Sequence, residues 1–106
     1  MITSTANAQV KNLVQLIKKS KARTEQGVYV VEGVKMFQEA PKEEIVKAYL
    51  SEELYEKGTL KDSLEGISYE VLKTEVFNHV ADTKTPQGVL CVLKQRKYTL
   101  DQLTDS

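Results

Sequence analysis

Two short polar segments, each next to an apolar run, contain residue types that could bind a phosphate backbone. Glu32-Gly33 follows the apolar run Val28–Val31, and residues 82–88 precede the apolar run Val89–Leu93. Both apolar runs predict buried strands of an α/β sheet, so the polar segments would lie on its rim. Ligands of α/β proteins bind at strand ends. The sequence therefore predicts a binding rim.

The first segment combines a glycine with a nearby cation. Gly33 would let a ligand approach the backbone closely, and the N–H groups at the start of the following helix favour a phosphate. Lys35 would add positive charge in the first turn of that helix. A steric requirement at a tight turn would explain Gly33 equally well.

The second segment offers uncharged polar groups. Thr83, Thr85 and Gln87 could contact sugar and base edges through hydroxyl and amide groups. Pro86 would stiffen the loop, and Gly88 would open it onto the following strand. Together with the first segment, these residues favour a nucleic acid as the ligand.

Charge is distributed unevenly along the 106 residues, although the net charge is zero. Residues 1–27 carry a net charge of +4, residues 28–83 a net charge of −6, and residues 84–97 again +4. Basic ends around an acidic middle indicate a nucleic-acid partner if the ends meet in the fold. Solvated helix faces remain the alternative. Within residues 1–27, the basic candidates for contact with a nucleic acid are Lys11, Lys18, Lys21 and Arg23.

Arg23 lies in residues 19–27, which we expect to form a loop. Its guanidinium could donate two hydrogen bonds to a phosphate or stack on a base, or it could be a solvated charge. Tyr29, Phe37 and Phe77 all fit the pattern of core residues. Recognition through backbone and shape is therefore favoured over base stacking.

No pattern in the sequence assembles an active site. Walker, GxGxxG, Ser-elbow and HExxH motifs are absent, and His79 has no suitable nucleophile beside it. Cys91 is the single cysteine and lies in an apolar run, which excludes an internal disulfide and a cysteine-based metal cluster. We expect no catalysis by this chain alone, no metal, no membrane segment and a cytoplasmic location.

Helical and strand patterns alternate along the chain. A stripe from Val10 to Ile17 predicts an amphipathic helix with Asn7 as its N-cap. Further helices are expected after Gly33, after Ser51 and from Thr74, which would cap its own helix. Four strands are expected at residues 28–31, 45–50, 67–72 and 89–93. This order predicts an α/β fold, a three-layer α/β/α sandwich with a mostly parallel four-stranded sheet.

Motifs spread over almost the whole chain resemble a known family. They are Asn7-x-x-Val10-Lys11, Lys21-x-Arg23, Val31-Glu32-Gly33 with Glu39-Ala40, and Val76-Phe77 followed by Asp82-Thr83-x-Thr85-Pro86-Gln87-Gly88-Val89. In this order and spacing they resemble the N-terminal substrate-binding domain of SpoU-family (TrmH-like) RNA ribose 2′-O-methyltransferases.

This resemblance implies a fold similar to the ribosomal proteins that bind kinked RNA. Those relatives grip RNA with the helix start after the first strand and with the loop before the last strand, which here correspond to Glu32–Lys35 and Thr83–Gly88. The family carries a second, knotted domain that binds S-adenosylmethionine and forms the dimer. That domain has no counterpart here, so residues 98–106 are interpreted as the start of a linker, and the chain as an excised domain rather than a natural truncation.

We therefore hypothesise that residues 1–97 form a domain that docks RNA for methyl transfer by a catalytic domain outside this chain. Ribosomal RNA is favoured over transfer RNA as the substrate. The isolated domain would be a monomer without a cofactor of its own. Phosphates would be neutralised by Lys11, Lys18, Lys21, Arg23 and Lys35, and the contact surface shaped by Glu32, Gly33, Thr83, Thr85, Gln87 and Gly88. The alternatives are a stand-alone binder of structured RNA and a protein-interaction module that packs on the catalytic domain.

Overall fold

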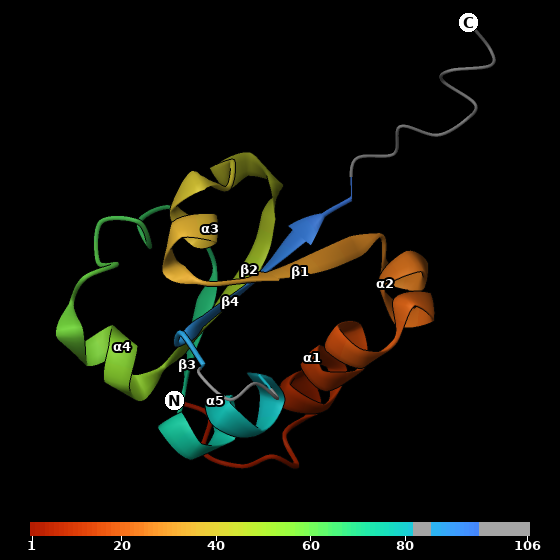
Figure 1. The fold of residues 1–106 in the computed structure, drawn as a ribbon, viewed down its shortest axis with the longest axis horizontal. Coiled ribbons are helices and arrows are strands. Elements are labelled where there is room, and N and C mark those ends of the chain that lie inside the picture. Colours follow the sequence, from red (N-terminus) through yellow and green to blue (C-terminus); the bar gives the residue numbers. More distant parts are fainter. Residues whose placement is uncertain (82–85, 96–106) are drawn as a thin grey trace, which may run out of the picture.

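The computed structural model describes residues 1–81 and 86–95 (Figure 1). Within them, helices and strands alternate as the sequence predicts. The helices are α1 (Ala8–Lys18), α2 (Ser20–Gln26), α3 (Val34–Glu39), α4 (Glu52–Lys57) and α5 (Thr74–Ala81), with a short 3₁₀ helix at Lys42–Glu44. The strands are β1 (Val28–Glu32), β2 (Ile45–Ser51), β3 (Tyr69–Leu72) and β4 (Val89–Lys94).

The four strands form one mixed sheet in the order β1-β4-β2-β3. β2 and β3 pair in parallel, whereas β4 lies between β1 and β2 and is antiparallel to both. Three strands thus point one way and the last strand points the other. The α/β class and the four strands are confirmed, but the expectation of a mostly parallel sheet is wrong for two of the three strand pairs.

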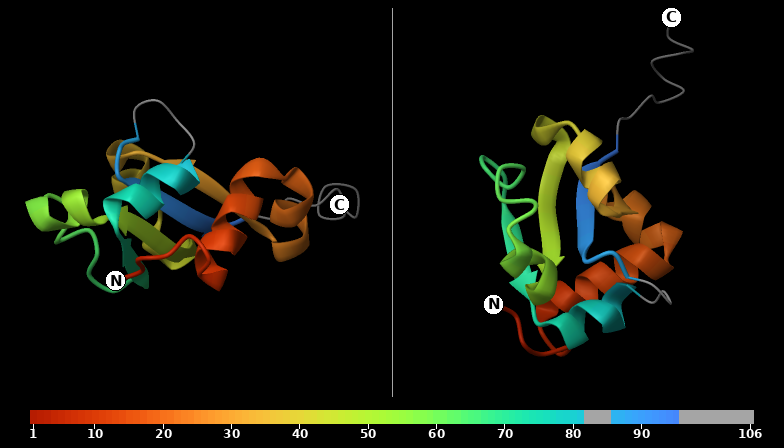
Figure 2. Two further views of the ribbon diagram at one scale, coloured as in Figure 1. Left: turned by 90° about the horizontal axis from the view of Figure 1, so that it is seen from below. Right: turned by 60° about the vertical axis from the view of Figure 1, so that its left-hand side comes forward.

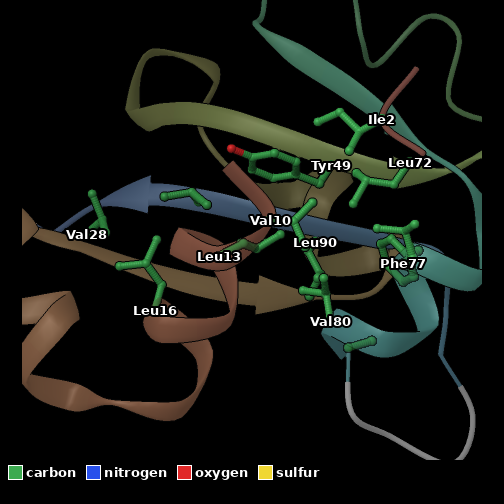
Figure 3. Close-up of a cluster of buried hydrophobic side chains, with 13 residues drawn as sticks. Ile2, Val10, Leu13, Leu16, Val28, Tyr49, Leu72, Phe77, Val80 and Leu90 are labelled. Atoms are coloured by element: carbon green, nitrogen blue, oxygen red, sulfur yellow. The ribbon is translucent and has the colours of Figure 1, made fainter. Parts of the chain in front are cut away.

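Two hydrophobic clusters cover the two faces of the sheet, which gives the expected three layers. On one face, Val10, Leu13 and Leu16 of α1 pack with residues of α5 against Val28 and Leu90 (Figure 3). α1 and α5 lie side by side there (Figure 2). The other face is covered by residues from α3, α4 and the turns that follow α4, namely Phe37, Leu54, Leu60 and Leu64. Burial of this kind is the main stabilising term of such a domain.

The first helix forms as the sequence predicts, but the segment after it does not. The Asn7 side chain accepts a hydrogen bond from the Gln9 backbone N–H at 2.8 Å, so Asn7 is the N-cap of α1. Residues 20–26, expected as a loop, form the helix α2, which ends at Gly27 with a φ of 67°. A left-handed glycine is the usual way to end a helix.

Two further contacts join segments that are distant in the sequence. Ile2 adds a single parallel bridge beside Leu72 at the edge of β3. Thr74 is the first residue of α5 and accepts a hydrogen bond from the Glu53 backbone N–H at 3.3 Å. It therefore links α4 to α5 and does not cap its own helix as expected.

Candidate nucleic-acid interface

The antiparallel direction of β4 brings residues 32–33 and residues 86–88, the described part of the second polar segment, to one end of the sheet. The start of β4 lies beside the ends of β1 and β2, since the Gly33 N–H donates to the Val89 carbonyl at 3.1 Å and the Ser51 N–H donates to the Gly88 carbonyl at 2.8 Å. A parallel β4 would have put residues 86–88 at the opposite end of the sheet. We call the edge formed by residues 32–35, 51 and 86–88 the rim.

At the rim, Glu32, Gly33 and Gln87 interlock. The Gln87 backbone N–H donates to Glu32 Oε2 at 3.3 Å, and the Gln87 side chain lies over Gly33. A Cβ at position 33 would stand 2.8 Å from Gln87 Oε1. Gly33 also has φ 118° and ψ 149°, a conformation that essentially only glycine adopts. The steric reason for Gly33 is thus present, and Glu32 orders the rim rather than facing a phosphate unpaired.

Gly88 is packed closely against the start of α4. Its φ is 89°, and a Cβ there would lie 3.0 Å from both the Leu54 Cβ and the Ser51 hydroxyl oxygen. The same Ser51 hydroxyl accepts the Leu54 N–H at 3.1 Å and caps α4. Position 88 therefore requires glycine so that the chain can enter β4 against the start of α4.

A pocket of about 250 Å³ lies next to this part of the rim. Its polar lining comes mostly from α4 and α5, which the sequence did not single out. Lys57 is in that lining and pairs with Glu53 at 3.9 Å. The lining residues are Ser51, Glu53, Leu54, Lys57, Thr74, Asn78 and Pro86 to Gly88. The sequence singled out residues 86–88 and, as helix caps, Ser51 and Thr74, but not Glu53, Lys57 and Asn78, because side chains on different helices meet only in the folded chain.

The basic candidates divide into two groups. Lys35 is exposed in the first turn of α3, at the rim. Lys18 and Lys21 are exposed near the start of β1, whereas Gly33 follows its end (Figure 1). A strand of this length separates its two ends by about 16 Å. Lys11 lies in the first half of α1 and is also exposed. The structure thus does not gather all predicted cations around the rim.

Arg23 forms hydrogen bonds to the end of α1. Its Nη1 donates to the carbonyl oxygens of Leu16 at 2.6 Å and Ile17 at 3.1 Å. These two carbonyls belong to the last turn of α1, whose terminal carbonyl groups need partners. Arg23 therefore fixes α2 to α1, and the prediction that it lies in a loop is wrong.

A cavity of about 370 Å³ lies along the edge strand β1. Arg23 and Glu32 both line it, together with Tyr29. Tyr29 is 38% exposed and is not the core residue that the pattern predicted. Its exposure could not be read from the sequence because β1 is an edge strand, which an apolar run does not reveal.

Other predicted features are placed as follows. Thr83 and Thr85 lie outside the described residues. His79 is exposed on α5. Cys91 is fully buried in β4, and burial raises the pKa of its thiol to about 12. Residues 1–81 and 86–95 contain no cluster of His, Cys, Asp or Glu that could hold a metal ion, and none of their helices is long and apolar enough to cross a membrane.

Comparison with solved structures finds the same fold in methyltransferases. An AdoMet-bound rRNA methyltransferase from Sinorhizobium meliloti superposes with a TM-score of 0.71 at 24% identity, over 95% of this chain and 38% of that one. The SpoU methyltransferase AviRb from Streptomyces viridochromogenes, in complex with the cofactor AdoMet, gives a TM-score of 0.64 at 17% identity, over 91% and 36%. An RNA 2′-O ribose methyltransferase gives 0.66 at 22%, over 93% and 39%.

These likenesses show the fold, and the chain spans less than two fifths of each of those proteins. A search of curated proteins gives no significant match. The family of the MRM3-like substrate binding domain matches residues 7–91, which is most of the chain and includes α1, the rim and most of the sheet. The chain therefore belongs to the MRM3-like substrate binding domain family, which confirms its resemblance to the N-terminal substrate-binding domain of SpoU-family methyltransferases.

Proposed function

We propose that this chain is an RNA-docking domain whose rim contacts the substrate RNA of a ribose 2′-O-methyltransferase. The observation that carries the proposal is the interlocked rim, where two distant segments meet and the exposed Gln87 covers the buried Gly33. Gln87 is exposed there, and Lys35 adds a cation on the same edge. Amide and ammonium groups on such a surface suit sugar and phosphate oxygens.

The reaction itself would belong to a domain outside this chain. Two of the solved relatives are described with bound AdoMet, and all are far longer than this chain. We propose that residues 98–106 begin a linker to such a domain, which would bind S-adenosylmethionine and form the dimer. The residues of this chain would hold and orient the RNA. Ribosomal RNA is the favoured substrate because a relative from Sinorhizobium meliloti is an rRNA methyltransferase, and a cytoplasmic location stays a prediction.

The test is RNA binding by the 106-residue chain, measured by fluorescence anisotropy with a library of ribosomal RNA hairpins. The variants Lys35→Gln and Gln87→Ala should each weaken binding, by about fivefold for the charge. Lys42→Gln is the matched control because it removes one lysine charge in the 3₁₀ helix before β2, about 20 Å from the rim end of that strand. The Lys42 ammonium donates to the Glu65 carbonyl at 3.0 Å, so circular dichroism should check that this variant stays folded. Equal effects of Lys35→Gln and Lys42→Gln would contradict a specific rim.

One observation favours a second candidate, a module that packs on a protein domain. Met36 follows Lys35 on α3 and is 50% exposed. An exposed apolar side chain beside the rim would suit a protein contact. Under this alternative, Gln87→Ala and Met36→Ser would leave RNA affinity unchanged and would weaken association with the separately produced catalytic domain.

A further inference from the structure

A groove lies between α1 and α5, on the side of α5 opposite the rim pocket. Its volume is about 420 Å³, and it is lined by Thr5, Lys11, Asn12, Val14, Gln15 and His79. Two of these side chains are basic, three more can form hydrogen bonds, and none is a carboxylate. The segment that contributes most of the lining, residues 1–27, carries a net charge of +4. This groove is therefore complementary to an anion with several polar oxygens.

The groove lies close to the rim along the chain and in space. Asn78 lines the pocket at the rim, and the next residue, His79, lines the groove on the other side of α5. Ala81, at the end of α5, lines the cavity that reaches Glu32. The rim pocket and the groove therefore lie on two sides of α5, about 10 Å apart, which is the width of one helix. α1 and α5 pack side by side along the groove (Figure 2).

We propose that the groove is a second RNA contact, in which Lys11 and His79 hold a phosphate–sugar segment of the strand that crosses α5 from the rim. This inference rests on the proposed function, and it specifies which part of the RNA the groove binds. Lys11 supplies a permanent charge, and an imidazole offers an N–H donor in either protonation state. Gln15 adds an amide group to the same lining, whereas the Asn12 amide is paired with the Gln26 amide by two hydrogen bonds of 3.2 Å and 2.8 Å. A duplex or a strand held at two points on one rigid domain is oriented as well as bound.

The experiment measures the affinity of the 106-residue chain for ribosomal RNA hairpins at several salt concentrations. Lys11→Gln and His79→Gln should each weaken binding about fivefold. Lys11→Gln should also reduce the slope of log affinity against log salt by about 0.7–0.9, the value of one phosphate contact. Lys42→Gln, which removes the same charge in the 3₁₀ helix before β2, is the control. Both substituted side chains are exposed, so circular dichroism melts should show unchanged folding.

Each other outcome overturns the inference. If Lys11→Gln and His79→Gln bind like Lys42→Gln while Gln87→Ala binds weakly, the groove is not an RNA site and the rim remains one. If only one of the two groove variants loses affinity, the groove does not act as one site. If the unsubstituted chain binds no RNA at low salt, the proposed function fails and the groove proposal fails with it.

Discussion

Backbone geometry, more than charge, determines which residue types occupy the rim. Glu32 accepts the Gln87 N–H, and the Gln87 side chain occupies the space that a side chain at position 33 would need. The exposed Gln87 side chain can move aside, so the positive φ of Gly33 is the stronger reason for glycine at this position. On this account Glu32 shapes the contact surface by holding Gln87 and need not touch RNA itself.

Gly33→Ala should be the more destabilising of two glycine substitutions. Gly33 adopts a glycine-only conformation under Gln87, so alanine should cost about 2–3 kcal/mol in the free energy of unfolding. Gly58 is the control because it has a φ of 72° and open space around it, so Gly58→Ala should cost about 1 kcal/mol. Urea denaturation of both variants checks this. An equal or smaller loss for Gly33→Ala would show that the rim geometry is wrong.

Cys91 should be unreactive in the folded chain. Because burial raises the pKa of its thiol to about 12, the thiolate is absent at pH 8, and an aromatic disulfide reagent should react only after unfolding. The raised pKa also lowers stability at high pH. The unfolded thiol, with a pKa of about 8.5, loses its proton first, so the free energy of unfolding should fall as the pH rises from about 8.5 towards 12.

The control for this pH dependence is Cys91→Ala, in which the thiol contribution is gone. The difference in urea midpoint between pH 8 and pH 10.5 should be smaller in that variant than in the unsubstituted chain. Rapid labelling of native Cys91 at pH 8 would contradict its burial.

At the scale of elements, α2 depends on its connections rather than on its own sequence. None of its residues is buried, and residues 20–26 have no apolar stripe. Arg23 anchors it to the end of α1, and Gly27 ends it before β1. A short helix with no fully buried residue is not stable alone, so these two contacts help to maintain it, together with the packing of Ala22 on the core and the hydrogen bonds between Asn12 and Gln26.

Arg23→Ala should destabilise the α1–α2 corner. Loss of the two hydrogen bonds to the Leu16 and Ile17 carbonyls should lower the free energy of unfolding by about 1–3 kcal/mol. Arg23→Lys should recover part of the loss because an ammonium can reach one carbonyl. Chemical denaturation measures both variants, and Lys21→Ala is the control because Lys21 is exposed in the same helix. An Arg23→Ala variant as stable as Lys21→Ala would contradict the anchoring role.

Much of this element order could be predicted because periodicity and caps are local. Asn7 and Ser51 cap α1 and α4 as expected, and the apolar runs form the strands. The direction of β4 could not be predicted, since a buried strand has the same apolar pattern in either direction. α2 was missed because its residues carry no apolar period. The α4 and α5 residues at the rim pocket were missed because only tertiary packing brings them to Gln87.

At the scale of the whole molecule, positive charge is concentrated at the start of the chain. Residues 1–27, with a net charge of +4, form α1 and α2, whereas residues 28–83, with a net charge of −6, supply the elements from β1 to α5, including Glu32 at the rim and Glu53 in its pocket. A neutral particle with one basic side should bind RNA with modest affinity and with strong dependence on salt. The cations at the rim and those along α1 are separated by more than the length of β1, so RNA that contacts both would span that distance.

RNA affinity should therefore fall steeply with salt. If the rim and α1 together contact about four phosphates, the slope of log affinity against log salt should be about −3 for a structured hairpin. Anisotropy titrations between about 20 and 200 mM salt measure it. A slope near zero would mean that phosphate contacts do not support binding.

The central claim is that RNA docks on the rim and the adjoining basic side, and an NMR titration with ribosomal RNA hairpins at low salt tests it most directly. We expect shifts of backbone amides to concentrate in residues 18–35 and 86–88, with further shifts near Lys11 and His79 if the groove takes part, and to fade as salt rises. Shifts confined to residues 42–47 and 61–70, which lie outside the rim and its pocket, or none at all, would contradict the claim.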